Sequence, residues 1–173
     1  MNSADEDRFL YFSFGSNLNK NRLQINCPSA KLISSGSLDG YELDFTLHTE
    51  RWGGAAADIR VHERGTVHGA IWSIRTDQLD KLDVQEGVSI GHYYRLEIGV
   101  KTPSGDQINC YTYKVLNPQS GLVPSALYMR VIIQGAIDVQ LPHEYIEALR
   151  SVATNSYDDD RRYQKALEGR GTF

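Results

Sequence analysis

Apolar and polar residues alternate along several stretches in the first two thirds of the chain, with the period of two that is typical of β-strands. The expected strands are residues 9–12, 41–47, 67–74, 93–100 and 108–115. The last two are separated by residues 102–106, which contain Pro103 and Gly105. Proline and glycine favour tight turns, so this pair is predicted to form a β-hairpin.

Helical patterns are fewer and are flanked by residues that favour helix starts. Thr76 is a candidate N-cap for a helix over residues 77–83, and Ser125 for a helix that runs to Asp138. A third helix is expected from near Pro142, because proline suits the first turn. Strands with inserted helices, without regular strand–helix alternation, predict an α+β domain whose mixed sheet curls into a barrel-like core.

The length of 173 residues and a hydrophobic content of 40% fit one globular domain over residues 1–173. We find no internal repeat and no linker that would divide it. Residues 1–7 and about 155–173 are polar, so they are expected to be peripheral tails.

Charge and composition exclude several classes of partner. The net charge of −4, with no run rich in lysine and arginine, argues against nucleic acid. No apolar run approaches the roughly 20 residues of a membrane span. The start of the chain does not resemble a signal peptide, and only Cys27 and Cys110 occur, both expected to be buried thiols. We therefore expect a cytoplasmic protein without a membrane partner.

The five histidines show neither a helical pair nor a neighbouring cysteine cluster with the spacing of a zinc site, so no metal is predicted. The glycine-rich fingerprints of nucleotide-binding loops are also absent.

A Gly-Ser-Asn-Leu loop follows the first expected strand and offers a candidate ligand site. Gly15 lacks a β-carbon, so the backbone can approach a ligand closely. The N–H groups of Ser16, Asn17 and Leu18 could then bind a carboxylate or an oxyanion. The alternative is structural: Ser16 and Asn17 would cap the helix that follows.

Two separated motifs resemble those of the γ-glutamylcyclotransferase family. Residues 12–18 resemble its Tyr-Gly-Ser-Asn-Leu loop, and residues 82–88 (Leu-Asp-Val-Gln-Glu-Gly-Val) resemble the segment that carries its catalytic glutamate. Shorter matches in the same order extend the similarity from Phe9 to about Leu149: residues 52–55, 69–72, 91–93 and 134–136.

The resemblance implies conversion of a γ-glutamyl amino acid to 5-oxoproline and a free amino acid, by attack of the substrate's α-amine on its own γ-carbonyl. It implies that Glu86 is the general acid/base, that the Gly15–Leu18 backbone holds the substrate, and that Tyr93 and Tyr128 complete the pocket. No cofactor is implied, and a homodimer is implied by the resemblance alone. The partner would be a small γ-glutamyl substrate.

In that reaction one carboxylate takes a proton from the α-ammonium group and later returns it to the departing amine. An α-amino group titrates near 8 and an ordinary glutamate near 4.3, so partial burial is expected to raise the pKa of Glu86. The alternative for Glu86 is a solvated residue after a helix.

Phe14 departs from the family pattern, since it stands where the loop usually has tyrosine. The missing hydroxyl could weaken substrate binding, or the ring could simply pack. Three functions therefore remain open: a cyclotransferase for γ-glutamyl amino acids, one for γ-glutamyl amines or glutathione, or a binding protein that retains the fold.

Overall fold

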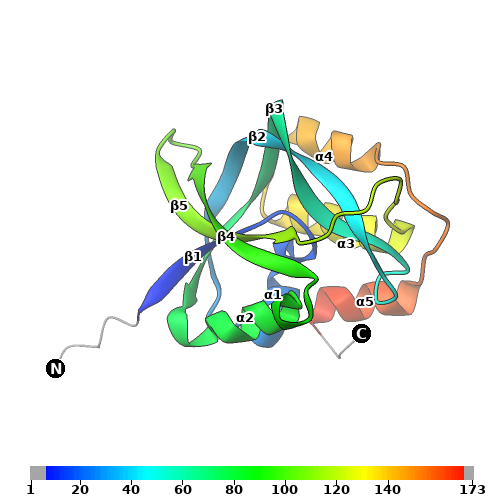
Figure 1. Cartoon of the computed structure of the whole chain (residues 1–173), viewed down its shortest axis with the longest axis horizontal. Coiled ribbons are helices and arrows are strands. Elements are labelled where there is room, and N and C mark those ends of the chain that lie inside the picture. The colour runs from blue at the N-terminus through cyan, green and yellow to red at the C-terminus, as the bar shows by residue number, and fades with distance from the viewer. Residues whose placement is uncertain (1–6, 170–173) are drawn as a thin grey trace.

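The computed structural model describes residues 7–169, and its centre is a closed barrel in the strand order β1-β3-β2-β4-β5 (Figure 1). Most neighbouring strands are antiparallel, whereas β1 and β5 pair in parallel. The predicted α+β class with a mixed, curled sheet is thereby confirmed. The strands are β1 (Arg8–Ser13), β2 (Lys31–Thr49), β3 (Gly54–Arg75), β4 (Tyr93–Lys101) and β5 (Gln107–Val115).

Strands β2 and β3 are much longer than their alternating patterns suggested. The predicted strands 41–47 and 67–74 are parts of strands of 19 and 22 residues. Three register shifts interrupt their pairing. Each such irregularity breaks the alternation of inward and outward side chains, so the sequence pattern stops where the strand continues. The predicted β4–β5 hairpin is confirmed, with Lys101 opposite Gln107.

Helices cover one side and one end of the barrel (Figure 1). Ser125 caps α3 as predicted, because its Oγ accepts the Tyr128 N–H at 3.0 Å. The prediction for Thr76 was wrong: it begins a 3-10 turn, and no side chain caps α2. The helical elements are η1 (Ser16–Leu18), α1 (Lys20–Asn26), η2 (Thr76–Gln78), α2 (Leu79–Gln85), η3 (Val88–Ile90), α3 (Ala126–Asp138), α4 (His143–Arg150) and α5 (Asp160–Glu168).

The core lies between the barrel and α3, and it fixes the loop after β1. Phe12, Trp72 and Leu127 are fully buried. The Trp72 indole N–H donates to Ser13 Oγ at 2.8 Å, directly before that loop. Helix α3 packs against η1, whose Leu18 side chain is also fully buried. The end of β1 and the start of η1 are therefore held from both sides.

The segment after about residue 155, expected to be a peripheral tail, contains helix α5. Ala166 on this helix is fully buried, and α5 packs against α1 and α3. Its other faces are polar, which is why composition alone hid its packing. Most of the expected N-terminal tail and residues 170–173 lie outside the described residues. None of the helices within residues 7–169 has the length and apolar character needed to cross a membrane.

Candidate active site

Glu86 stands at the end of α2, where the chain turns sharply toward β4. Its own N–H still donates to the Leu82 carbonyl, as in the preceding helix. The next residue, Gly87, has a φ of 67°, a left-handed conformation that side chains with a β-carbon rarely adopt. The α2 helix ends there, and the half-buried Glu86 side chain lines two cavities.

A chain of side-chain amides holds the Glu86 carboxylate. Asn17 Nδ2 donates to Glu86 Oε1 at 3.0 Å and lies 3.1 Å from the Tyr11 hydroxyl. Gln85 Nε2 in turn donates to Asn17 Oδ1 at 2.9 Å. Asn26, at the end of α1, donates to Gln85 Oε1 at 2.7 Å. This chain fixes the orientation of the carboxylate from the loop after β1.

Burial raises the pKa of Glu86 from 4.5 to about 7. The positive charges of Arg22 and Arg51 oppose that shift, as does the hydrogen bond from Asn17. Glu86 can therefore change its protonation state near neutral pH. This is the property that a group needs in order to take up and return a proton in one reaction cycle.

The two cavities meet at Glu86. The larger has a volume of about 400 Å³ and is lined by the start of η1, the turn after β2 and the end of α2. The smaller, of about 40 Å³, lies toward the barrel and is lined by Gly15 and Asn17. Both are bordered by Ser16, Glu86, Tyr93 and Tyr128. These four residues therefore lie between the two cavities.

Tyr93 and Tyr128 meet on the peptide group of Ala57. The Tyr93 hydroxyl donates to the Ala57 carbonyl at 2.7 Å, whereas the Tyr128 hydroxyl accepts the Ala57 N–H at 3.1 Å. Burial raises the pKa of Tyr128 to about 12, so it stays protonated. The Ala57 N–H contacts only the oxygen of the Tyr128 hydroxyl, so the hydroxyl hydrogen of Tyr128 can be donated to a ligand.

The loop after β1 supplies three of its four predicted residues to the cavities. Gly15, Ser16 and Asn17 line the smaller cavity. Leu18 lines neither cavity, its side chain is fully buried, and its N–H donates to the Gly15 carbonyl at 3.0 Å. The predicted ligand contact of Leu18 is therefore not provided by this arrangement.

The alternative that Ser16 and Asn17 cap the following helix is wrong. Asn19 is the residue that caps α1, since its Oδ1 accepts the Arg22 N–H at 2.9 Å. Ser16 Oγ instead accepts from Arg22 Nε at 2.9 Å. Both Ser16 and Asn17 are thus used at the site.

Two arginines in the larger cavity were not found from the sequence. Arg22 is 6% exposed, and its guanidinium lies 4.8 Å from the centre of a Trp52 ring. Arg51 lies in the turn between β2 and β3 and is exposed. Neither residue has a local pattern that marks it, although Trp52 belongs to one of the segments that resemble the family. Their role becomes visible only when the chain is folded.

Phe14, which replaces the usual tyrosine, lines the smaller cavity with its ring 6.5 Å from that of Phe12. His92 is exposed and borders the larger cavity. Among residues 7–169 there is no cluster of three or more His, Cys, Asp or Glu side chains that could hold a metal ion.

Comparisons with known proteins agree with this arrangement. Residues 66–149 match the model of the AIG2-like family. The chain is 37% identical to the γ-glutamylcyclotransferase of Bos taurus, over 91% of this chain and 85% of the relative, and 36% identical to that of Homo sapiens, over 88% and 83%. A solved γ-glutamyl cyclotransferase structure superposes with a TM-score of 0.88 at 32% identity, covering 92% of this chain and 98% of that one. The chain belongs to the γ-glutamylcyclotransferase family.

Proposed function

We propose that this protein converts γ-glutamyl amino acids to 5-oxoproline and a free amino acid, with Glu86 as the general acid/base. The observation that carries the proposal is a half-buried carboxylate with a pKa of about 7, held by Asn17 at the junction of two cavities. The bovine and human relatives bear the name of this activity.

The first step is removal of a proton from the substrate's α-ammonium group by Glu86. The freed lone pair attacks the γ-carbonyl carbon, a new carbon–nitrogen bond closes the five-membered ring, and the carbonyl oxygen takes up negative charge. Because nucleophile and carbonyl belong to one molecule, the cavity mainly has to hold them within about 3.5 Å. The folded glutamyl chain would occupy the space beside Glu86.

The developing negative charge on oxygen needs a hydrogen-bond donor. The Tyr128 hydroxyl is suitable, because Ala57 holds its oxygen and leaves its hydrogen available. A well-aimed donor of this kind contributes about 3 to 4 kcal/mol to stabilising a transition state. Gly15 and Ser16 border the same small cavity and leave room for the oxygen.

In the second step the tetrahedral adduct collapses. The γ-carbonyl re-forms, the bond to the leaving nitrogen breaks, and Glu86 returns its proton to that nitrogen. The ring nitrogen of the adduct still carries one surplus proton, which passes to the departing amine, so the products are a neutral lactam and an ammonium group. Protons then balance, and Glu86 is again a carboxylate. A carboxyl with a pKa near 7 can do both tasks, whereas an ordinary glutamate would be a weak base for an amine that titrates near 8.

The substrate's α-carboxylate has a natural partner in Arg22. This arginine lies in the wall of the larger cavity, close enough to Glu86 for each charge to affect the pKa of the other. A planar guanidinium can hold a carboxylate through two parallel hydrogen bonds. Arg22 would then place the α-carbon so that its amine faces Glu86.

The test is 5-oxoproline release from γ-glutamyl-alanine by the purified protein, with Glu86→Gln assayed under the same conditions. We expect turnover by the wild type and a loss of roughly 10²-fold or more in the variant. Glutamine is nearly isosteric and can still accept the Asn17 hydrogen bond, so circular dichroism should show an unchanged fold. Turnover that is equal in the two proteins would remove Glu86 from the reaction.

No release by a folded wild-type protein would contradict the proposal. Repeating that assay with glutathione and with a γ-glutamyl amine would then separate a related cyclotransferase from a binding protein. A ligand that binds without forming product would indicate the latter.

A further inference from the structure

The turn between β2 and β3, residues 50–53, lines the larger cavity and is fixed by hydrogen bonds and packing. Glu50, Arg51 and Trp52 all line the cavity. Three successive carbonyl oxygens of this turn accept hydrogen bonds from side chains elsewhere in the chain. The donors are Arg162 Nη1 to Arg51 at 3.3 Å, Ser125 Oγ to Trp52, and Asn155 Nδ2 to Gly53 at 2.9 Å.

Packing closes the same turn from the outside. Gly53 has a φ of 65°, and a β-carbon built on it would lie 2.3 Å from Cδ1 of Tyr157. The segment that carries Tyr157 links α4 to α5 and runs along that side of the molecule (Figure 1). The backbone of Arg51 is therefore fixed, and its side chain starts from a defined point at the cavity mouth.

Within the part of the chain that the structure describes, the Arg51 guanidinium acts on its neighbours through its charge alone. Residues 7–169 provide neither an ion pair nor a side-chain hydrogen bond for it. It nevertheless lines the cavity that contains Glu86. The cavity thus has two cations at different depths, a buried one at Arg22 and an exposed one at Arg51.

A γ-glutamyl amino acid also carries two charges of the opposite sign at two positions. One carboxylate is on the glutamyl α-carbon, and the other is on the leaving amino acid, on the far side of the bond that breaks. If Arg22 holds the first beside Glu86, the second is directed toward the cavity mouth. Exposed polar side chains that line the cavity are His48, Glu50, Arg51 and His92. With Arg22 occupied by the first carboxylate, Arg51 is the one arginine or lysine among the described lining residues that remains for the second.

We propose that Arg51 recognises the carboxylate of the leaving amino acid and so makes the enzyme select γ-glutamyl amino acids over γ-glutamyl amines. The inference rests on the proposed function. Arg51 is then a specificity residue: it touches the part of the substrate that departs and takes no part in proton transfer. The firmly held turn gives the pairing a fixed distance from Glu86.

The experiment compares two substrates that differ in that carboxylate alone. γ-Glutamyl-alanine releases alanine, and γ-glutamyl-ethylamide releases ethylamine, which is alanine without its carboxylate. We would measure kcat/KM for 5-oxoproline release from both, in the wild type, Arg51→Gln and Arg51→Lys. We would compare the ratio of kcat/KM for γ-glutamyl-alanine to kcat/KM for γ-glutamyl-ethylamide. Any effect of Arg51 on the pKa of Glu86 is common to both substrates and cancels in this ratio.

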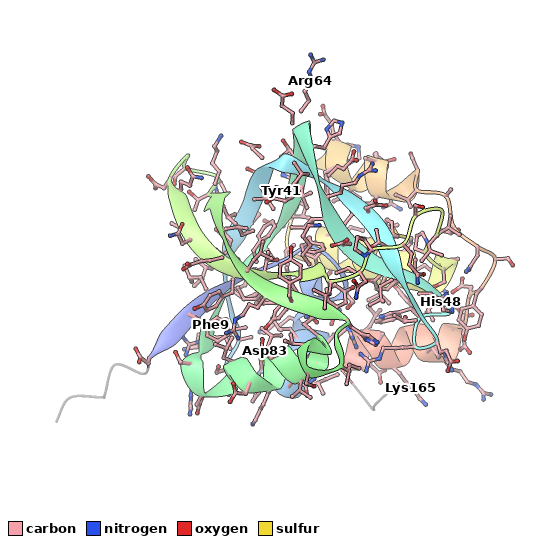
Figure 2. The ribbon with its side chains drawn as sticks, viewed as in Figure 1. Phe9, Tyr41, His48, Arg64, Asp83 and Lys165 are labelled. Atoms are coloured by element: carbon pink, nitrogen blue, oxygen red, sulfur yellow. The ribbon has the colours of Figure 1, made fainter. Side chains whose placement is uncertain are left out.

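For Arg51→Gln we expect that ratio to fall about 10- to 100-fold, the range for a hydrogen-bonded charge, with most of the change in KM for γ-glutamyl-alanine. Arg51→Lys should recover part of the preference because it keeps the charge. The matched control is Arg64→Gln, the same charge change on β3. Figure 2 shows Arg64, on the middle part of β3, at the top of the molecule and well apart from His48, which lines the cavity. In Arg64→Gln the ratio should stay at the wild-type value.

A ratio that Arg51→Gln leaves unchanged, in an enzyme that turns over both substrates, would overturn the role of Arg51 and leave the proposed function standing. An equal fall in Arg64→Gln would also overturn it, because the effect would then be one of net charge. Release of 5-oxoproline from neither substrate by the wild type would instead overturn the proposed function, and this inference with it.

Discussion

Opposing effects of the surroundings set the pKa of Glu86. Burial disfavours its charged form, while Asn17 and the two arginines favour it, and the balance leaves the pKa at about 7. The expectation from the sequence that burial raises this pKa agrees with the structure. With burial alone the carboxyl would be a poor acid in the second step, and with the arginines alone a poor base in the first.

The pH dependence of turnover follows from that balance. The free enzyme must hold Glu86 as a carboxylate to accept the amine proton, so kcat/KM should rise with pH and level off above about 7. Below that value it should fall about tenfold for each pH unit. A pH series of initial rates with γ-glutamyl-alanine measures this part of the profile, and a midpoint near 4.5 would mean that the surroundings of Glu86 do not raise its pKa.

Asn17 is expected to act on the reaction through Glu86. The hydrogen bond from Asn17 to Glu86 Oε1 favours the charged carboxylate, so its loss in Asn17→Ala should raise the pKa of Glu86. The acidic limb of the pH profile should therefore move to higher pH, and kcat should fall. The Tyr11 hydroxyl also loses a partner, so unfolding should become easier by about 1 to 3 kcal/mol.

The control is Gln85→Ala, which removes the support of Asn17 but leaves its bond to Glu86 in place. This variant should shift the limb less than Asn17→Ala does. If Asn17→Ala lost stability while its pH profile kept the wild-type midpoint, Asn17 would be a packing residue without influence on the carboxylate.

Single residues of the site could be predicted to the extent that a motif marks them. Glu86 and Tyr93 lie in the cavity as their motifs suggested, with Tyr93 inward and Tyr94 exposed. Asn17 was expected to use its backbone N–H, yet its side chain makes the contact that matters. Arg22 and Arg51 belong to polar stretches without periodicity, so nothing local distinguishes them from surface arginines.

At the scale of elements, the pattern identified which segments are strands and helices better than where they end. The β4–β5 hairpin has regular register and a Pro/Gly turn, and its prediction holds nearly to the residue. Strand β3 contains three consecutive alanines, a residue type with low preference for strands, and its pairing with β2 is irregular. Helix α5 buries little apolar surface, so its position depends on α1 and α3 rather than on its own pattern.

The end of α2 is the element boundary on which the site depends most. Gly87→Ala would place a β-carbon on a left-handed residue and 3.1 Å from His92 Nδ1, so the chain would have to shift next to Glu86. We expect a loss of about 1 to 2 kcal/mol in the free energy of unfolding, and a fall in kcat that is larger than the loss of folded protein explains.

Gly105→Ala is the matched control for that variant. Gly105 also has a positive φ, of 93°, but it lies in the β4–β5 turn with open space around it. Urea denaturation and kcat should be measured for both variants. Gly105→Ala should lose stability and keep its turnover per folded molecule. Equal turnover in the two would show that the geometry at Gly87 is not needed for catalysis.

At the scale of the whole molecule, the site exists because barrel closure brings distant segments together. Asn17 and Glu86 are 69 positions apart, and Ala57 and Tyr128 are 71 apart, yet each pair shares a hydrogen bond. Sequence patterns describe neighbours along the chain, so they predicted the barrel class and the motif residues. They could not show that the β2–β3 turn and the start of α1 would face Glu86 across one cavity.

The half-buried Glu86 carboxyl also links the site to the stability of the molecule. Its pKa is about 7 in the folded protein and near 4.5 in the unfolded chain, so between these values the folded state binds more protons. Stability therefore falls as pH rises from 4.5 to 7 and is flat above. Glu86→Gln removes this titration, so the variant should exceed the wild type by about 2 to 3 kcal/mol at pH 8, with little difference at pH 4.5.

Urea denaturation at pH 4.5, 6 and 8 measures the difference between the two proteins at each pH. The control is Glu97→Gln on β4, where the side chain is exposed and the same neutralisation should change stability little at any pH. A difference that grows with pH only for Glu86→Gln would show that the protein gives up stability for a base that works near neutral pH. A wild type more stable than Glu86→Gln at pH 8 would mean that Asn17 and the arginines outweigh burial, and the carboxyl would then be too weak a base for the proposed proton transfer.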